Sequence, residues 1–95
     1  MRSVIDILDL SKEEIASLID TAEDIIKRPE RYSQVCHGKK LATLFFEPST
    51  RTRLSFEAAM YELGGNVLGF SSAANTSASK GESVADTAKV ISCYA

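Results

Sequence analysis

The sequence predicts an α/β fold built around a parallel βαβ unit, and three observations support this. An apolar run over residues 41–46 predicts a strand over residues 40–46, of the kind that is buried on both faces in a parallel sheet. A helical pattern follows over residues 50–63, and a second apolar run covers residues 66–70. A strand, a helix and a strand within about 30 residues form a βαβ unit, whose crossover is expected to be right-handed.

The N-terminal part predicts a lead-in and one amphipathic helix. Residues 1–9 contain apolar side chains suited to docking, and Ser11 with Glu14 forms a capping box, in which each side chain bonds the other's backbone N–H. Pro29 ends the helix, expected over residues 12–28, because the residue before a proline disfavours helical angles. Its predicted apolar face consists of Ile15, Leu18, Ile19, Ala22, Ile25 and Ile26.

Residues 29–39 read as a polar loop that carries the single histidine, His37. We expect His37 to be solvated rather than catalytic, because a general base needs a partner within reach. Cys36 and Cys93 lie far apart and form no C-x-x-C motif, so we expect two reduced structural cysteines and no metal site.

Residues 49–53, Ser-Thr-Arg-Thr-Arg, are named the cradle here, and they lie between the first strand and the following helix. The first amides of a helix have no partner inside it, and the helix dipole adds partial positive charge, so such a place binds anions. Ser49, Thr50 and Thr52 supply hydroxyl donors, while Arg51 supplies a planar fork that matches a phosphate. In a parallel sheet the ligand lies at the carboxyl end of a strand, which is the position of the cradle.

A simpler interpretation of the same residues is an N-cap followed by solvated arginines. Arginine in a first helical turn opposes the dipole, which is electrostatically unfavourable unless an anion is present. Three hydroxyls and two arginines within residues 49–53 therefore favour a binding site over a simple cap.

After the cradle, the helix over residues 50–63 is expected to end at Gly64-Gly65 in a left-handed C-cap. Residues 71–81 are small and polar, which is typical either of a surface linker or of a binding loop, and Lys80 is the one charge among them. Residues 82–95 predict a last helix that stops without a capping signal, which suggests a truncated chain. The predicted buried residues of the helix over residues 50–63 are Leu54, Phe56, Ala58, Met60 and Tyr61. The last helix is expected to place Val84, Ala88, Ile91 and Ala95 on one face.

Two stretches resemble a known family. Residues 46–53, Phe-Glu-Pro-Ser-Thr-Arg-Thr-Arg, resemble the carbamoyl-phosphate signature of the aspartate and ornithine carbamoyltransferases. Residues 72–87 resemble the aspartate branch. The resemblance runs through nearly all of residues 1–95 but covers only the first part of a full-length family member. It implies an N-terminal part of the carbamoyl-phosphate-binding domain, with the aspartate-binding domain absent.

The resemblance implies transfer of a carbamoyl group from carbamoyl phosphate to the amine of L-aspartate, giving N-carbamoyl-L-aspartate and phosphate in pyrimidine biosynthesis. It implies no cofactor, no metal and no covalent enzyme intermediate. By resemblance, Ser49, Thr50 and Thr52 hold the phosphate, Thr52 also lies near the carbamoyl oxygen, and Arg51 stabilises charge on the leaving group. Arg53 belongs to the same motif, but we expect it to have a structural role, in which its side chain pairs with Glu57 at i,i+4.

The resemblance further implies a homotrimer with shared active sites. In it, Ser77 and Lys80 belong to a loop that reaches the active site of a neighbouring subunit, where Lys80 contacts phosphate and the aspartate carboxylate. The catalytic set is thus Arg51, Thr52 and Lys80. A separate regulatory chain is a further partner that the resemblance allows. A fragment that consists of residues 1–95 alone should therefore have negligible turnover.

Composition restricts the other classes. The chain has 11 basic and 13 acidic residues, and no basic tract indicates nucleic-acid binding. No apolar run approaches the roughly 18 residues of a membrane span, and no signal peptide is recognisable, so a cytoplasmic protein is expected. The alternatives are an ornithine carbamoyltransferase, disfavoured by residues 72–87, and a non-catalytic phosphate-binding or interaction domain.

Overall fold

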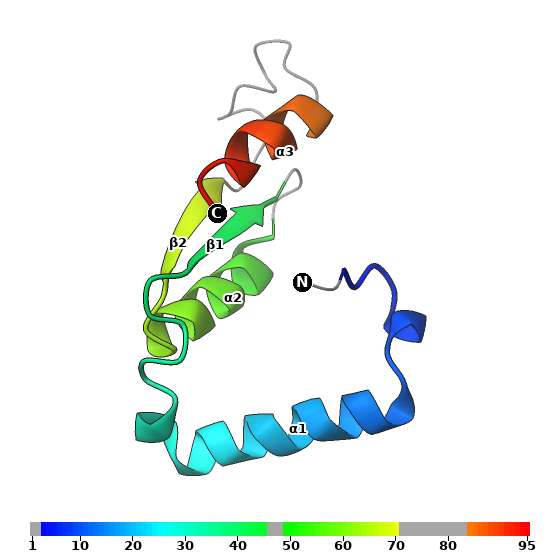
Figure 1. Cartoon of the computed structure of the whole chain (residues 1–95), viewed down its shortest axis with the longest axis vertical. Helices are drawn as coiled ribbons and strands as arrows, with labels where there is room; N and C mark the ends of the chain where they lie inside the picture. The colour runs from blue at the N-terminus through cyan, green and yellow to red at the C-terminus, as the bar shows by residue number, and fades with distance from the viewer. Residues whose placement is uncertain (1–2, 46–48, 71–83) are drawn as a thin grey trace. The chain divides into compact units, whose positions relative to one another are not determined.

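The structure is a computed structural model, and it describes residues 3–45, 49–70 and 84–95. It divides into two compact units, Met1–Arg31 and Tyr32–Ala95, each taken by itself below. The elements in chain order, shown in Figure 1, are η1 (Ile7–Asp9), α1 (Lys12–Lys27), η2 (Pro29–Arg31), β1 (Lys40–Leu44), α2 (Thr50–Glu62), β2 (Asn66–Phe70) and α3 (Val84–Ser92).

Unit 1 begins with η1, a single turn of 3-10 helix that the sequence did not predict. The backbone N–H groups of Ile5 and Asp6 donate to Asp9 Oδ2 at 2.8 and 3.0 Å. These two hydrogen bonds hold the pKa of the Asp9 carboxyl below its ordinary value, because they stabilise its charged form. The N–H of Leu8 donates to Asp6 Oδ1 at 3.2 Å and completes the cap.

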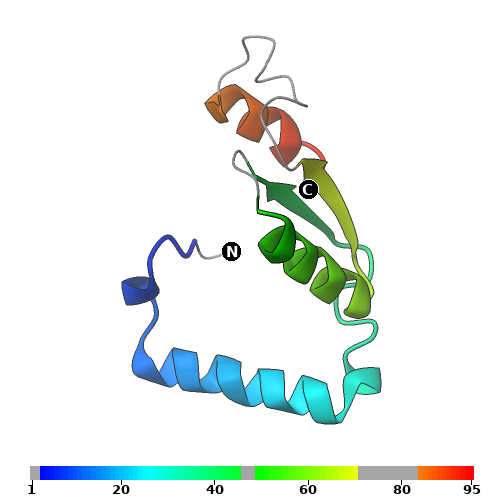
Figure 2. The same cartoon turned by 180° about the vertical axis from the view of Figure 1, so that it is seen from behind.

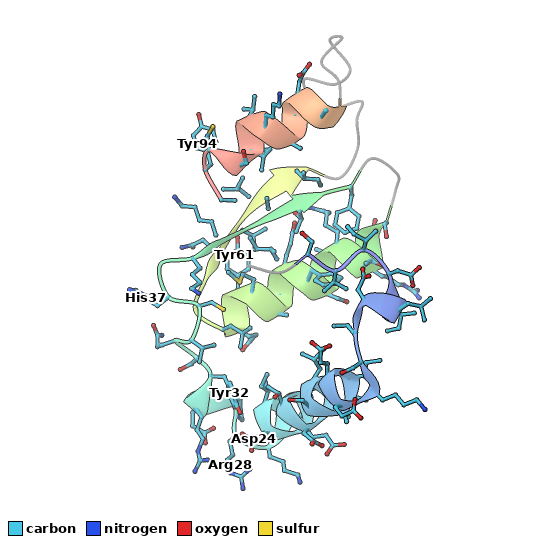
Figure 3. The ribbon with its side chains drawn as sticks, turned by 45° about the vertical axis from the view of Figure 1, so that its right-hand side comes forward. Asp24, Arg28, Tyr32, His37, Tyr61 and Tyr94 are labelled. Carbon is cyan, nitrogen blue, oxygen red and sulfur yellow. The ribbon has the colours of Figure 1, made fainter. Side chains whose placement is uncertain are left out.

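The predicted capping box of α1 is confirmed. The N–H of Glu14 donates to Ser11 Oγ at 3.1 Å, and the N–H of Ser11 donates to Glu14 Oε1 at 3.0 Å. The helix ends at Lys27, two residues before Pro29, as the sequence predicted to within one residue. In the last turn Arg28 forms an ion pair with Asp24, and Figure 3 shows the two side chains together.

The apolar face predicted for α1 is not buried among the described residues of this unit. None of the described residues of α1 is buried; Ile15 and Ile25 are half-buried, and Leu18 is 59% exposed. Within its unit α1 packs on η2, a single turn that is too small to cover the apolar face of a 16-residue helix. The sequence pattern thus identified the face correctly but not its environment.

Unit 2 contains the βαβ core that the sequence predicted. β1 and β2 pair in parallel, with a register from Lys40 opposite Asn66 to Leu44 opposite Phe70. α2 connects the two strands and packs against both, as Figure 2 shows. The cradle therefore lies where the sequence placed it, between the carboxyl end of β1 and the body of α2.

β1 is less buried than predicted. Thr43 is buried, with 4% of its surface exposed, whereas Leu41, Ala42 and Leu44 are half-buried. Strand side chains point to the two faces of a sheet, and α2 is the described helix that packs against both strands, so the faces are not both covered as in a parallel sheet with helices on each side. Among the described residues, the side chain that is most buried in this strand is thus a polar one.

α2 presents a different face to the sheet from the one predicted. Leu54, Phe56 and Tyr61 were expected to be buried, but they are exposed, with Tyr61 at 57% (Figure 3). Ala58 is exposed as well. The less exposed positions recur at helical spacing along another stripe, which consists of Ser49, Arg53, Glu57, Met60 and Leu63. This stripe contains an ion pair rather than apolar side chains alone, so hydrophobicity was a poor guide to the covered face.

The C-terminal end of α2 confirms the predicted left-handed cap. Gly64 has φ +87°, its N–H donates to the Tyr61 carbonyl at 3.0 Å, and the Gly65 N–H donates to the Met60 carbonyl at 3.0 Å. This pair of bonds is a Schellman motif. A Cβ on Gly64 would also lie 2.4 Å from the Ser33 carbonyl oxygen, so glycine is required here for conformation and for space.

We expect Gly64→Ala to lower the free energy of unfolding by about 1–3 kcal/mol, because a Cβ there is strained and also collides with backbone. Gly38→Ala is the matched control, since Gly38 has φ +79° but nothing within 4 Å of an added Cβ. Urea unfolding of both variants, followed by circular dichroism, compares the two losses. Equal losses would mean that the contact with Ser33 adds nothing to the conformational strain.

α3 ends before the end of the helix predicted over residues 82–95. It runs from Val84 to Ser92, with Asp86 in its first turn, and residues 82 and 83 lie outside the described residues. Ile91 is half-buried as its predicted position on the apolar face requires, but Ala88 and Ala95 are exposed. The helical type was therefore predicted correctly, and the C-terminal end of the helix was predicted too far along the chain.

Candidate functional site

The cradle forms the N-terminus of α2. The N–H of Arg53 donates to the Ser49 carbonyl at 3.0 Å, which is the first intrahelical bond. The amides of Thr50, Arg51 and Thr52 precede that bond, so they have no acceptor inside the helix. Three backbone donors and the positive end of the dipole of a 13-residue helix are therefore available in one turn.

Ser49 occupies the N-cap position without acting as a cap. It has φ −152° and ψ 63°, and its side chain makes no capping hydrogen bond. Ser11, at the equivalent position of α1, accepts from the N–H of Glu14. The simple N-cap interpretation of Ser49 therefore does not describe this structure, and the Ser49 hydroxyl keeps its hydrogen-bonding capacity for a ligand.

Charge separates the first turn of α2 from those of the other two α-helices described. α1 has Glu13 and Glu14 in its first turn and α3 has Asp86, as the dipole favours, whereas α2 has no acidic residue there. Its first turn contains Arg51 and Arg53 instead. A positive helix end with added guanidinium groups attracts an anion more strongly than the dipole alone does.

The side chains of Thr50, Arg51 and Thr52 are exposed, and none of them forms an ion pair or a hydrogen bond with another described residue. Three donors of the predicted phosphate site are therefore accessible in one helical turn, together with the half-buried Ser49. These four residues are the part of the predicted set that the structure brings together.

Arg53 differs from Arg51. Its side chain is 29% exposed, and Arg53 Nη1 lies 3.5 Å from Glu57 Oε2, which confirms the predicted i,i+4 pair. The same Glu57 oxygen accepts a hydrogen bond from Thr43 Oγ1 on β1 at 2.8 Å. Sequence reasoning missed Thr43. The signal was a hydroxyl residue in the middle of an otherwise aliphatic strand, directly opposite a glycine in the partner strand.

The predicted loop residues Ser77 and Lys80 lie outside the described residues, so their roles stay predictions. His37 is exposed, in agreement with the expectation of a solvated side chain (Figure 3). Cys36 and Cys93 are both free thiols. Over residues 3–45, 49–70 and 84–95, no three acidic, histidine or cysteine side chains are grouped as metal ligands, and no helix is long and apolar enough to span a membrane.

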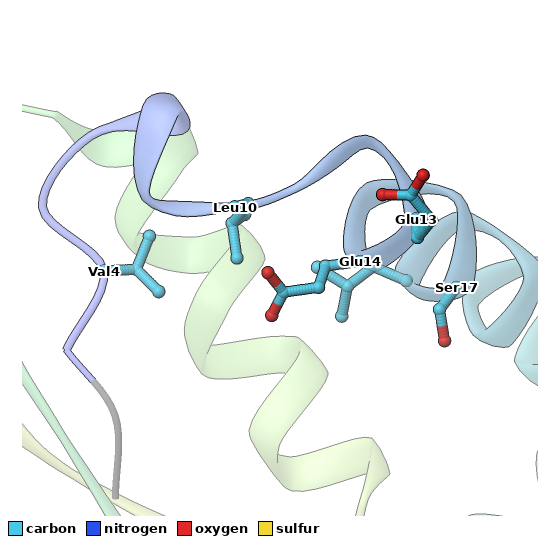
Figure 4. A pocket seen from close by; sticks show the side chains of 6 residues that line it. Val4, Leu10, Glu13, Glu14 and Ser17 are labelled. Carbon is cyan, nitrogen blue, oxygen red and sulfur yellow. The ribbon is translucent and has the colours of Figure 1, made fainter.

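Unit 1 has a hollow of its own, of about 510 Å³, which Figure 4 shows. It is lined by Val4, Leu10, Glu13, Glu14, Ser17 and Leu18. Its two carboxylates would repel a phosphate, and the Ser17 hydroxyl is the one side-chain donor among its lining residues. The hollow is therefore no competitor to the cradle as an anion site.

Comparison with known proteins also points to a domain that binds a phosphate compound. Residues 2–95 match the model of the aspartate/ornithine carbamoyltransferase, carbamoyl-P binding domain. The chain is 65% identical over 95 residues to the aspartate carbamoyltransferase catalytic subunit of Lachnoclostridium phytofermentans, covering 100% of this chain and 31% of that protein. The chain thus spans about a third of the length of such curated relatives.

Solved structures are similar over the same length. The catalytic subunit of M. jannaschii aspartate transcarbamoylase superimposes with a TM-score of 0.85 at 46% identity, covering 100% of this chain and 32% of that one. Aspartate transcarbamoylase from Trypanosoma cruzi, in complex with carbamoyl aspartate and phosphate, superimposes with a TM-score of 0.89 at 33% identity, covering 99% of this chain and 31% of that one.

Proposed function

The chain belongs to the aspartate/ornithine carbamoyltransferase family, in its carbamoyl-phosphate-binding domain, and from that premise we propose that the protein transfers a carbamoyl group from carbamoyl phosphate to L-aspartate. The observation that carries the proposal is the N-terminus of α2. Three amides without an acceptor inside the helix, a Ser49 hydroxyl that makes no capping bond and an Arg51 without an ion pair to another described residue meet there, and the first turn has no acidic side chain. Aspartate is favoured over ornithine as acceptor because relatives that are 65% and 58% identical to this chain are named for aspartate.

The reaction needs two anionic substrates in one place. The amine nitrogen of aspartate attacks the carbamoyl carbon, a C–N bond forms, and the negative charge moves to the carbamoyl oxygen. The bond from that carbon to the phosphate oxygen then breaks, phosphate leaves with the electron pair, and the nitrogen loses a proton. Donors fixed before the reaction stabilise the charge on both the carbamoyl oxygen and the leaving phosphate.

We assign the cradle residues to these two tasks. Ser49, Thr50 and Thr52, with the three helix amides, hold the phosphate of carbamoyl phosphate. Thr52 also donates to the carbamoyl oxygen as charge develops on it. Arg51 binds the phosphate through two parallel N–H bonds and stabilises it as it leaves. No metal or cofactor is part of this proposal.

The remaining assignments rest on the resemblance. Residues 1–95 form the N-terminal part of the carbamoyl-phosphate-binding domain in this proposal, and the aspartate site lies outside them. Ser77 and Lys80 complete the active site of a neighbouring subunit in a cytoplasmic homotrimer, with a regulatory chain as a further partner. Residues 1–95 alone would therefore bind phosphate but have negligible turnover.

The local part of the proposal is tested by phosphate titration of residues 1–95, followed by amide NMR. We expect the amide signals of Thr50 to Arg53 to move with increasing phosphate, because the donors all lie in one turn. Binding should be weak, since the lysine of a neighbouring subunit is missing. The amides of Glu13 and Glu14, in the acidic first turn of α1, are the internal control and should not move.

If the fragment is folded and the cradle amides are unmoved at saturating phosphate, the cradle does not bind phosphate by itself. The substrate assignment is tested separately in the full-length protein, with carbamoyl phosphate and either L-aspartate or L-ornithine. Product formed from ornithine alone would move the protein to the ornithine branch. Phosphate binding without either product would leave a non-catalytic phosphate-binding domain.

A further inference from the structure

We propose that Glu57 is a positioning residue for the cradle, and that it acts by holding Arg53 while Thr43 holds Glu57 from β1. This inference rests on the proposed function, because it concerns the same phosphate site. Neither Glu57 nor Thr43 belongs to the residues assigned to substrate above. Together they connect the strand before the cradle to the helix turn inside it.

The contacts form a chain across the βα junction. Thr43 Oγ1 donates to Glu57 Oε2 at 2.8 Å, and the same oxygen lies 3.5 Å from Arg53 Nη1. The Thr43 residue is 4% exposed, and the Glu57 side chain is 18% exposed. One carboxylate oxygen thus receives one donor from β1 and one from the first turn of α2.

The neighbouring strand, β2, leaves room for the Thr43 side chain. Gly69 on β2 pairs with Thr43 in the parallel register. A Cβ at Gly69 would lie 2.5 Å from Thr43 Oγ1 and 1.9 Å from the Thr43 carbonyl oxygen. Any other residue at position 69 would displace Thr43. The closer of these contacts is with the backbone of residue 43, so glycine is required here by the close approach of the two strands, and the Thr43 hydroxyl occupies part of the same space.

Stability alone does not account for a charged pair on the covered stripe of α2. A partly buried ion pair contributes little net stability, and apolar side chains of similar size often serve as well or better. Helix α2 has such side chains available, but Leu54, Phe56 and Tyr61 lie on its exposed surface. The pair is thus better explained by the geometry it imposes than by the energy it contributes.

The imposed geometry concerns the cradle directly. Thr43 precedes the cradle and Glu57 follows it, so their hydrogen bond holds the strand end and the helix at one separation. Arg53 is the last cradle residue, and its backbone N–H closes the first helical turn onto Ser49. The Nε–H of Arg53 is buried without an acceptor among the described residues, so Glu57 is the one described partner that holds this guanidinium in place. Without Glu57 the guanidinium and the turn that carries it lose their anchor.

The test uses the full-length protein with Glu57→Gln and with Glu62→Gln as the matched control. Gln keeps the size of the side chain and removes its charge, and Glu62 is an exposed residue of the same helix. We expect Glu57→Gln to lower kcat/KM for carbamoyl phosphate by about 10–100-fold, as the loss of a group that orients a metal ligand does in metal sites. KM for carbamoyl phosphate and the inhibition constant of inorganic phosphate should both rise, while Glu62→Gln should stay within about 2-fold of the parent.

A second pair of variants separates positioning from folding. Thr43→Val removes the hydroxyl and should reproduce part of the loss, whereas Thr43→Ser keeps the hydroxyl and should restore phosphate binding. The double variant Thr43→Val/Glu57→Gln should lose little more than Glu57→Gln alone, because both substitutions break the same connection. If Thr43→Val does not fold, the comparison of Glu57→Gln with Glu62→Gln still decides whether Glu57 positions the cradle.

A structural role alone would lower the melting temperature and the active fraction, but it would leave KM and the phosphate inhibition constant unchanged in the folded protein. That result, or equal effects of Glu57→Gln and Glu62→Gln, overturns the inference while the parent enzyme still turns over. A parent protein without carbamoyl transfer would instead reject the proposed function itself. The two failures are therefore distinguishable.

Discussion

Replacing Arg51 with lysine in the full-length protein is expected to lower turnover by about 10²–10³-fold, the usual loss when one preorganised charge-stabilising donor is removed. Lysine keeps the positive charge but loses the planar fork that binds two phosphate oxygens at once. Arg51 is exposed and has no ion pair with a described residue, so its guanidinium is not committed to holding the fold. The substitution should thus affect the chemistry and leave the melting temperature nearly unchanged.

The measurement is steady-state turnover at saturating aspartate over a range of carbamoyl phosphate concentrations. Arg31→Lys is the matched control, because Arg31 is an exposed arginine in the other unit. It should behave as the parent does. Near-normal turnover of Arg51→Lys would mean that Arg51 attracts the substrate as a simple charge and has no part in stabilising the leaving phosphate.

Mixing two inactive full-length variants is expected to restore activity to about a quarter of the parent. In a cyclic trimer the interface is heterologous, so each chain gives its loop to one neighbour and receives a loop from the other. The variants are Arg51→Ala and Lys80→Ala, dissociated, mixed equally and reassembled. A site is intact only when its Arg51 comes from a Lys80→Ala chain and its Lys80 comes from an Arg51→Ala neighbour. Random assortment makes that about one site in four.

The control is each variant dissociated and reassembled alone, which should stay inactive. If Arg51 and Lys80 instead served the same site from one chain, every site in the mixture would lack one of them. Activity of the mixture no higher than that of the separate variants would then reject shared sites. It would leave the cradle assignment in place, since that rests on the N-terminus of α2 alone.

The βαβ core and the position of the cradle could be predicted because their signals are local. A capping box at Ser11 and Glu14, a proline at residue 29 and a glycine at residue 64 determine helix ends through nearby backbone hydrogen bonds. The apolar runs gave both strands to within two residues. The cradle was found for the same reason, since its hydroxyls, arginines and amides occupy one helical turn.

Burial could not be predicted in the same way, because it depends on which other elements lie nearby. The helical pattern placed Leu54 and Tyr61 inside, yet both are exposed, and the covered stripe of α2 carries Arg53 and Glu57. Likewise the first strand was expected to be buried on both faces, but α2 is the described helix that packs against it, so its two faces are not both covered. A hydrophobicity pattern identifies an apolar face, and it contains no information on whether a partner covers it.

For this protein the sequence by itself determined the order and type of the elements, the ends of α1 and α2 and the residues of the cradle. Each of these follows from interactions between residues a few positions apart. The tertiary structure alone decided that Ser49 is not used as a cap, that α2 turns a charged stripe toward the sheet, and that Thr43 meets Glu57 opposite Gly69. The last two of these depend on contacts between residues 14 or more positions apart, so they exist only once β1, α2 and β2 have packed together.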